Sequence, residues 1–279
     1  MHWHTTRFHI DLSQTRVMGI VNVTPDSFSD GGRHAEAGAA LAHCERLVAE
    51  GAHILDIGGE STRPGAAALS EQQECDRVLP VIEAALPLGV PVSVDTSSAL
   101  VMREALALGV DIVNDVRALQ RAGALLTVAA HPSVGVCLMH TRGEPATMQA
   151  LTGYGDVVSE VADFLADRAR TLEAAGIAHD RIVVDPGIGF AKTDTDNLAL
   201  LARQAELRRG WPLLVGWSRK RTLGQLTGRA VGERTVASAT AALLAAQQGA
   251  AIVRVHDVAA TVDALKVWQA VVQRTRPCP

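Results

Sequence analysis

Short runs of β-branched and other apolar residues alternate along this chain with longer segments rich in Ala, Leu, Glu and Arg at helical spacing. Most of the short runs are continuously apolar, which is typical of parallel strands covered on both faces. The predicted strands span residues 17–23, 53–58, 92–95, 112–115, 134–140, 182–185, 213–216 and 252–256. This repeated strand–helix order predicts an α/β fold, a (β/α)₈ TIM barrel.

The segments between the runs carry apolar residues three and four positions apart, which indicates helices. The predicted helices span residues 35–50, 71–86, 99–108, 157–175, 196–207, 233–248 and 258–272, with a shorter one within 120–130. Glycines that would end helices in the left-handed conformation follow several of them, at Gly51, Gly89, Gly109, Gly176 and Gly249. An open doubly wound sheet is the alternative fold, but the Gly-x-Gly-x-x-Gly motif expected after its first strand is missing.

No linker or change of composition divides the chain, so residues 1–279 are predicted to form a single barrel domain. Residues 1–15 are predicted to be a short leader into the first barrel strand. Lys and Arg total 26 and Asp and Glu total 30, which gives a formal net charge of −4. Nucleic acids and anionic membranes call for a basic face, so neither is an expected partner. An anionic substrate must be held by a few local cations.

The chain is predicted to stay in the cytoplasm. Its longest apolar stretches, such as 134–139 and 241–246, are far shorter than the roughly 18 residues of a membrane span. The N-terminal residues lack the basic region and apolar run of a secretory signal. The four cysteines lie far apart, with the spacing of neither a disulfide framework nor a zinc site.

Polar residues gather at the end of each predicted strand, which is the catalytic face of a barrel. They include Asn22, Asp56, Asp95, Asn114, His140, Asp185, Lys220, Arg254 and His256. Each alone has a structural explanation, because Asp and Asn cap helices and a single His is usually a hydrogen-bonded core residue. Together they favour one pocket for a small molecule, since unpaired polar groups are costly to bury.

The residue types narrow the chemistry of this pocket. Asp95, Asn114 and Asp185 suit the edge of a heterocycle rich in N–H donors, and Met139 and Phe190 offer apolar surface for its flat ring. Further residues suit a phosphate-bearing end with a divalent cation, namely Asn22, Arg63, Arg254 and His256. The loops after the first two strands are long and rich in Gly, Ser and Pro, which is typical of lids that exclude water.

Several of these strand-end segments together resemble the motifs of the dihydropteroate synthase family of pterin-binding enzymes. They are residues 22–32, 56–65, 94–96, 114–116, 185–190, 218–220 and 254–256. The resemblance implies condensation of 6-hydroxymethyl-7,8-dihydropterin diphosphate with p-aminobenzoate. The products would be 7,8-dihydropteroate and pyrophosphate, in folate biosynthesis. It also implies Mg²⁺ as cofactor and a homodimer, which the apolar helices at 233–248 and 258–272 favour as well.

The resemblance assigns a role to each matching residue. Residues predicted to hydrogen-bond the pterin are Asp95, Asn114, Asp185 and Lys220, and its apolar walls are Met139 and Phe190. Asn22 matches a Mg²⁺ ligand, and Arg254 and His256 match anchors of the diphosphate. The residues implied at the p-aminobenzoate site are Phe28, Thr62, Arg63, Pro64, Lys220 and Arg221, with Thr62 also at the diphosphate. The predicted catalytic residues are Asp95, Lys220, Arg254 and His256.

Two departures from the family pattern bear on the p-aminobenzoate site. Arg221 stands where many synthases carry a Ser beside the aminobenzoate carboxylate, and Trp217 stands where a small residue is usual. Arg221 is predicted to bind that carboxylate through its backbone N–H or its guanidinium. The alternatives are a non-catalytic pterin-binding paralogue, which these two departures support, and a methyltetrahydrofolate methyltransferase. The methyltransferase would need neither Arg254 and His256 nor the loop at 61–65.

Overall fold

A closed barrel of parallel strands forms the centre of the molecule. The computed structural model describes residues 1–23, 32–60, 69–144 and 147–275. The barrel strands are β3 (Arg16–Asn22), β4 (Ile54–Gly58), β5 (Val92–Asp95), β6 (Ile112–Asp115), β7 (Gly135–Met139), β8 (Ile182–Asp185), β9 (Leu214–Val215) and β10 (Ile252–Val255). Their order in the sheet is β8-β7-β6-β5-β4-β3-β10-β9, and a bridge from Val184 to Leu213 joins its two ends. The (β/α)₈ barrel and all eight predicted strands are therefore confirmed.

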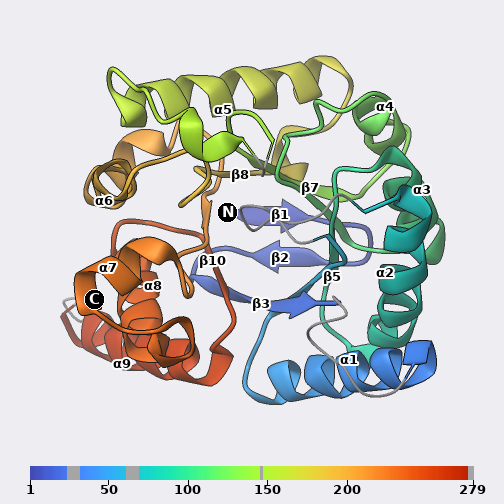
Figure 1. The fold of residues 1–279 in the computed structure, drawn as a ribbon, viewed down its shortest axis with the longest axis horizontal. Helices are drawn as coiled ribbons and strands as arrows, with labels where there is room; N and C mark the ends of the chain where they lie inside the picture. The colour runs from blue at the N-terminus through green and yellow to red at the C-terminus, as the bar shows by residue number, and fades with distance from the viewer. Residues whose placement is uncertain (24–31, 61–68, 145–146, 276–279) are drawn as a thin grey trace.

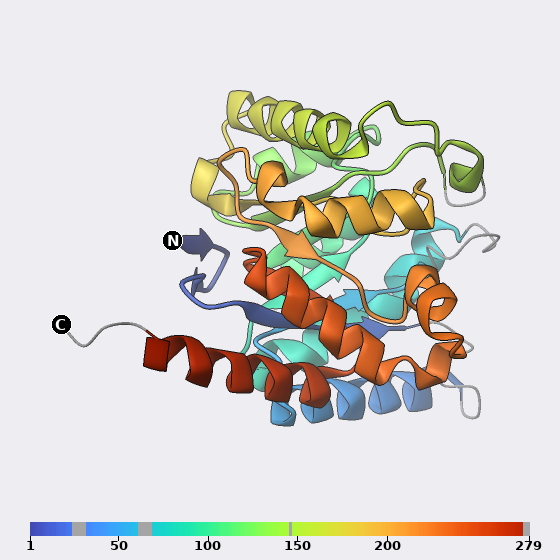
Figure 2. The same ribbon diagram turned by 90° about the vertical axis from the view of Figure 1, so that its left-hand side faces the viewer.

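The helices surround the barrel (Figures 1 and 2). They are α1 (Gly32–Ala49), α2 (Glu71–Ala85), α3 (Ala99–Leu108), α4 (Ala124–Ala129), α5 (Val157–Ala174), α6 (Asp194–Ala202), α7 (Arg221–Thr227), α8 (Thr235–Gln247) and α9 (Val258–Thr275). The predicted helix over 196–207 divides into α6 and a 3₁₀ turn, Gln204–Leu207. Helix α7 was not predicted, because its seven residues contain Thr and Gly and no apolar period. In the part of the chain that the structure describes, no helix has the length and apolar character to cross a membrane.

The strands are buried on both faces, and successive side chains pack in opposite directions. In β3, Val17 and Val21 belong to the layer under the helices, whereas Met18 belongs to the barrel interior. One interior residue from nearly every strand joins Met18, namely Ile54, Ile112, Cys137, Val183, Leu214 and Ile252. This alternation leaves the inward positions at the C-terminal strand ends for polar side chains.

The N-terminal residues predicted as a leader form a hairpin that closes the other end of the barrel. Strands β1 (His2–His4) and β2 (His9–Asp11) pair antiparallel. Trp3 is fully buried against the interior cluster, and its Nε1 donates to the carbonyl of Arg181 at 2.9 Å. Three-residue strands carry too few positions for a periodic signal, so the sequence did not predict this hairpin.

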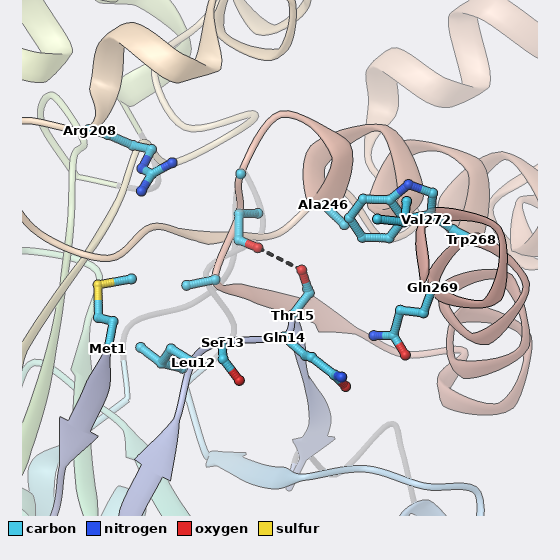
Figure 3. A pocket seen from close by; sticks show the side chains of 13 residues that line it. Met1, Leu12, Ser13, Gln14, Thr15, Arg208, Ala246, Trp268, Gln269 and Val272 are labelled. Atoms are coloured by element: carbon cyan, nitrogen blue, oxygen red, sulfur yellow. Dashed lines mark hydrogen bonds between the residues drawn. The ribbon is translucent and has the colours of Figure 1, made fainter. Parts of the chain in front are cut away.

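A cavity of about 470 Å³ lies at this hairpin end, between the entrance to β3 and helix α9 (Figure 3). Thr15, Arg208 and Trp268 are among its lining residues, and the Thr15 hydroxyl donates to the carbonyl of Ala250 at 2.8 Å. None of the predicted site residues lines it. The cavity is therefore separate from the strand ends where the chemistry was predicted.

Candidate active site

Arg254 of β10 is the centre of a polar cluster inside the C-terminal end of the barrel. Its Nε donates to Asp56 Oδ2 at 2.6 Å, and its Nη2 donates to Asp95 Oδ2 at 2.7 Å. The amide Nδ2 of Asn114 donates to the same oxygen of Asp56 at 3.1 Å. Asp56, Asp95 and Asn114 lie on the adjacent strands β4, β5 and β6, where Asp95 pairs with Asn114 and Asp56 pairs with Ser93, two residues before Asp95. Two carboxylates thus share one guanidinium.

This sharing has electrostatic consequences. Burial raises the pKa of Asp95 to about 7, although Arg254 opposes the shift. Burial also works against the charge of Arg254, but Asp56 and Asp95 outweigh it and hold its pKa above the usual value. A guanidinium has five N–H donors, and the contacts to these carboxylates use two of them. Arg254 therefore remains charged and keeps donors for an anion.

Asp185 ends β8 and begins a tight loop. Its Oδ1 accepts from the backbone N–H of Gly187 at 2.7 Å. Gly187 has a φ of 67°, and a Cβ there would lie 2.0 Å from the carbonyl oxygen of His140, so only glycine fits. Burial raises the pKa of Asp185 to about 6, while the Gly187 hydrogen bond and Lys220 oppose the shift. The carboxylate is ionised at neutral pH and available as an acceptor.

Lys220 and Phe190 face each other beside Asp185. The Lys220 Nζ lies 4.4 Å from the centroid of the Phe190 ring, within range of a cation–π contact. Burial lowers the pKa of Lys220 to about 8, and Arg254 contributes to the shift. Met139, the last residue of β7, is 4% exposed. This part of the site combines apolar surface with one cation.

His256 follows β10 and is oriented by Ser218. The Ser218 hydroxyl oxygen accepts from the backbone N–H of His256 at 3.1 Å, and it lies 3.0 Å from the ring Nδ1. Burial and Arg254 lower the pKa of His256 to about 3, so the ring is neutral. A neutral imidazole has two tautomers, and the one in which the Ser218 hydroxyl donates to Nδ1 carries its proton on Nε2. In that tautomer His256 donates a hydrogen bond from Nε2.

The structure brings most of the predicted pocket residues together. Arg254 contacts Asp95, Lys220 contacts Phe190, and Asn114 reaches Arg254 through Asp56. The side chain of Arg221 is 65% exposed, and its Nη2 lies 3.4 Å from Asp194. The guanidinium of Arg221 thus lies on the surface. The predicted residues Phe28, Thr62, Arg63 and Pro64 lie outside the described residues.

Asp56 was placed at the strand-end pocket from the sequence but was given no role there, yet it contacts both Arg254 and Asn114. Its side chain is fully buried, and within the described ranges its Oδ1 has no hydrogen-bond partner. The available signal was a carboxylate in the middle of the otherwise apolar strand Ile54–Gly58. Ser218 was also missed, since its part depends on the conformation of the turn before α7.

The side chains at the strand ends can be compared with the oxygen ligands that Mg²⁺ prefers. No group of three or more His, Cys, Asp or Glu side chains that could hold a metal occurs among the described residues. Asn22 is the last residue of β3, and its carboxamide supplies a hard oxygen donor. Mg²⁺ typically keeps several waters and binds one or two protein ligands together with substrate phosphates. Asn22 therefore fits a metal site that a diphosphate completes.

Comparison with known proteins gives a consistent result. The model of the family described as "Pterin binding enzyme" matches residues 18–256. The chain is 52% identical to dihydropteroate synthase of Neisseria meningitidis serogroup B, with 96% of each chain covered. It is 49% identical to that of Escherichia coli K12, with 94% of this chain and 93% of the relative covered.

Solved structures agree. Xanthomonas albilineans dihydropteroate synthase with 4-aminobenzoic acid superposes with a TM-score of 0.92 at 50% identity, covering 99% of this chain and 100% of that one. Burkholderia cenocepacia dihydropteroate synthase complexed with 7,8-dihydropteroate gives a TM-score of 0.90 at 48% identity, covering 99% and 98%. A Yersinia pestis dihydropteroate synthase complex with a sulfonamide drug gives 0.92 at 46% identity, covering 98% and 100%.

Proposed function

Because this chain belongs to the family of pterin-binding enzymes, we propose that it catalyses the reaction of its synthase relatives. It condenses 6-hydroxymethyl-7,8-dihydropterin diphosphate with p-aminobenzoate, forming 7,8-dihydropteroate and pyrophosphate in folate biosynthesis. The observation that carries the proposal is that the C-terminal end of the barrel has two chemically different parts. Acceptors and apolar surface lie around Asp185, while Arg254 and His256 keep N–H donors for an anion.

The pterin binds by its polar edge. Asp185, as an ionised acceptor, takes hydrogen bonds from the N–H groups of the heterocycle, and Asn114 and Asp95 complete the edge. The ring lies between Met139 and Phe190. Lys220 reaches toward both this ring and the p-aminobenzoate, since its ammonium lies over Phe190.

The reaction begins with heterolysis of the bond between the methylene carbon and the diphosphate oxygen, and pyrophosphate keeps the electron pair. The electron-rich dihydropterin delocalises the positive charge, and the carboxylate of Asp95 balances it. Arg254 and His256 donate hydrogen bonds to the developing negative charge on the leaving group, where such donors act most strongly. Asn22 would hold Mg²⁺, and the bound ion would supply positive charge beside the leaving group. The amine nitrogen then forms the new C–N bond, and its proton passes to water or to the released pyrophosphate.

The alternatives differ in what they ask of these residues. A methyltetrahydrofolate methyltransferase has no diphosphate to use the donors of Arg254 and His256. A non-catalytic paralogue would keep the pterin pocket and lose p-aminobenzoate. Of the two departures that support it, Trp217 is buried in the core and the Arg221 guanidinium lies on the surface. The backbone N–H of Arg221 is still available at the start of α7.

The direct test measures pyrophosphate release from dihydropterin diphosphate and Mg²⁺, with and without p-aminobenzoate, while dihydropteroate is followed. We expect release and product that both depend on p-aminobenzoate. Tight binding of the pterin diphosphate without product would identify the non-catalytic paralogue. Absence of both binding and product would overturn the proposal.

Replacing Lys220 with alanine is expected to lower kcat by about 10²–10³-fold, because the site loses the cation that faces Phe190 and both substrates. The control is Lys266→Ala, since Lys266 is exposed on α9. Steady-state kinetics with both substrates varied would measure the effect. Near-normal turnover in Lys220→Ala would remove Lys220 from the mechanism.

We also propose that the protein is a homodimer, supported by apolar side chains that α8 and α9 present to solvent. The packed pair α8 and α9 forms one side of the barrel (Figure 2). Val236 and Leu244 of α8 and Val267 and Val271 of α9 are all exposed. Light scattering at micromolar concentration should give twice the chain mass, and Val236→Glu with Val267→Glu should give the monomer. A wild-type monomer would contradict the dimer.

A cytoplasmic location remains part of the proposal. Cys44, Cys75 and Cys137 are buried free thiols, which suits a reducing compartment.

A further inference from the structure

Lys192 is a buried lysine to which the proposed reaction gives no role. It follows the loop after β8, and its residue is 1% exposed. Its Nζ donates to the carbonyls of Gly187 at 3.0 Å and Phe190 at 2.9 Å, both in that loop. It also lies 3.0 Å from Nδ1 and 3.4 Å from the carbonyl oxygen of His140, the residue after β7. One amino group therefore joins the ends of two neighbouring strands, and burial lowers its pKa to about 7, so the ammonium form prevails below neutral pH.

The acceptor partner His140 is suited to this contact. Burial and the charge of Lys192 lower the pKa of His140 to about 2, so its ring is neutral and Nδ1 accepts from the ammonium. The ring packs edge-on against Phe164, with centroids 4.9 Å apart. The position of His140 is thus fixed from its other side as well.

The loop between Asp185 and Lys192 needs such an attachment. Gly187, Gly189 and Ala191 have φ values of 67°, 82° and 49°, and this conformation is strained for the alanine. Left-handed residues at alternate positions direct the carbonyls of Gly187 and Phe190 toward one point, where the Lys192 Nζ donates to both. The Gly187 carbonyl also accepts from the backbone N–H of Phe190 at 3.1 Å, so loss of Lys192 would leave the Phe190 carbonyl without its side-chain donor.

The same loop carries the groups that face the pterin. Asp185 is held by the N–H of Gly187, and the Phe190 ring faces Lys220. A Cβ at Gly189 would lie 3.3 Å from Lys220 Cδ, so this segment also packs against the lysine chain. On the β7 side, Met139 precedes His140. A shift of the loop would move the acceptor and one wall of the pocket together.

We propose that Lys192 is a positioning residue for the pterin pocket, which it holds by tying the β8 loop to the end of β7. This inference rests on the proposed function for the identity of the ligand. Lys192 itself touches no substrate in this arrangement, because its donors are directed at protein acceptors. Its loss should weaken pterin binding selectively, since displaced groups lose their alignment with the ligand.

The test compares Lys192→Met with Lys266→Met, a control at an exposed lysine. We expect Lys192→Met to raise KM for dihydropterin diphosphate by about 10–100-fold. The KM for p-aminobenzoate and kcat at saturation should stay within about threefold of wild type. Lys266→Met should match wild type in all three constants. A fall in kcat alone, equal changes in both KM values, or no change would overturn the proposal.

A second variant covers the case in which Lys192→Met does not fold. His140→Phe keeps an aromatic ring beside Phe164 and removes both ring nitrogens, among them the Nδ1 acceptor of Lys192, so it should raise the same KM by a smaller factor, about 3–10-fold. An unchanged KM in folded His140→Phe, with Lys192→Met unfolded, would count Lys192 as a residue of stability only. Calorimetric titration with dihydropterin diphosphate measures binding even if the wild type makes no product, which separates this inference from the proposed function.

Discussion

Replacing Arg254 with glutamine is expected to lower kcat by about 10²–10³-fold, because the diphosphate loses a charged donor where negative charge develops. The KM for p-aminobenzoate should change little, since that substrate does not use the guanidinium. Steady-state kinetics with each substrate varied would measure both constants. Arg203→Gln is the matched control, because Arg203 pairs with Asp156 and Glu206 on the surface. Loss of activity of similar size in both variants would contradict a specific role for Arg254.

The same variant should change how stability depends on pH. The pKa of Asp95 is raised from the ordinary value of 3.8 to about 7, so the folded protein takes up a proton that the unfolded chain releases. The stability from this group is therefore complete below about pH 4 and is lost as the pH rises through about 7. Arg254 opposes the shift, so its removal should raise the pKa of Asp95 further. The Tm difference between wild type and Arg254→Gln should grow from pH 5 to pH 8. A constant difference would contradict this coupling.

Asp185→Asn is the second change with a large expected effect. The amide places a donor where the pterin also presents donors, and loss of charged hydrogen bonds worth about 1.5–3 kcal/mol each should weaken binding by about 10²–10³-fold. Calorimetry with 6-hydroxymethylpterin, which has no phosphates to titrate, would measure the effect. Wild-type affinity in Asp185→Asn would remove this carboxylate from the pocket.

The pH dependence of the same titration supplies an independent check. The pKa of Asp185 is raised to about 6, so the acceptor form is present above this pH and is lost as the pH falls through it. Wild-type affinity for 6-hydroxymethylpterin should therefore fall below about pH 6, and Asp185→Asn should lack that decline. A further change in the affinity near pH 7 would reflect the titration of Asp95. Affinity that is flat from pH 5 to pH 8 in the wild type would contradict the assignment.

The sequence predicted the barrel because each strand is a separate apolar run, and a parallel sheet brings all strand ends to one face. Asp95, Asn114 and Arg254 could be placed at that face for the same reason, and the structure brings them together through Asp56. Which of these side chains form hydrogen bonds with one another could not be predicted. It depends on which inward side chains meet across the barrel, and sequence spacing carries no information about that.

Other features depend on backbone conformation and lay beyond sequence reasoning. In the sequence, Lys192 cannot be told from an ordinary loop lysine. Its role depends on the left-handed residues of the loop, which direct two carbonyls at its Nζ. Arg221 was predicted from the family resemblance, because it stands where many synthases carry a Ser, yet its side chain at the start of α7 lies beside Asp194. The hairpin around Trp3 was missed because its strands are too short for a pattern.

The pairing that closes the barrel also constrains the order of folding during synthesis. Strand β3 emerges from the ribosome early, but its neighbour on one side is β10, where Ile252 pairs with Arg16. Until β10 is made, that edge of β3 has unpaired N–H and C=O groups, and such an edge invites pairing with other chains. The hydrogen bond from Trp3 Nε1 likewise cannot form until Arg181 has been synthesised. The growing chain must therefore avoid pairing with other chains until β10 has been synthesised. Slow translation or a high concentration of nascent chains should favour aggregation over the closed barrel.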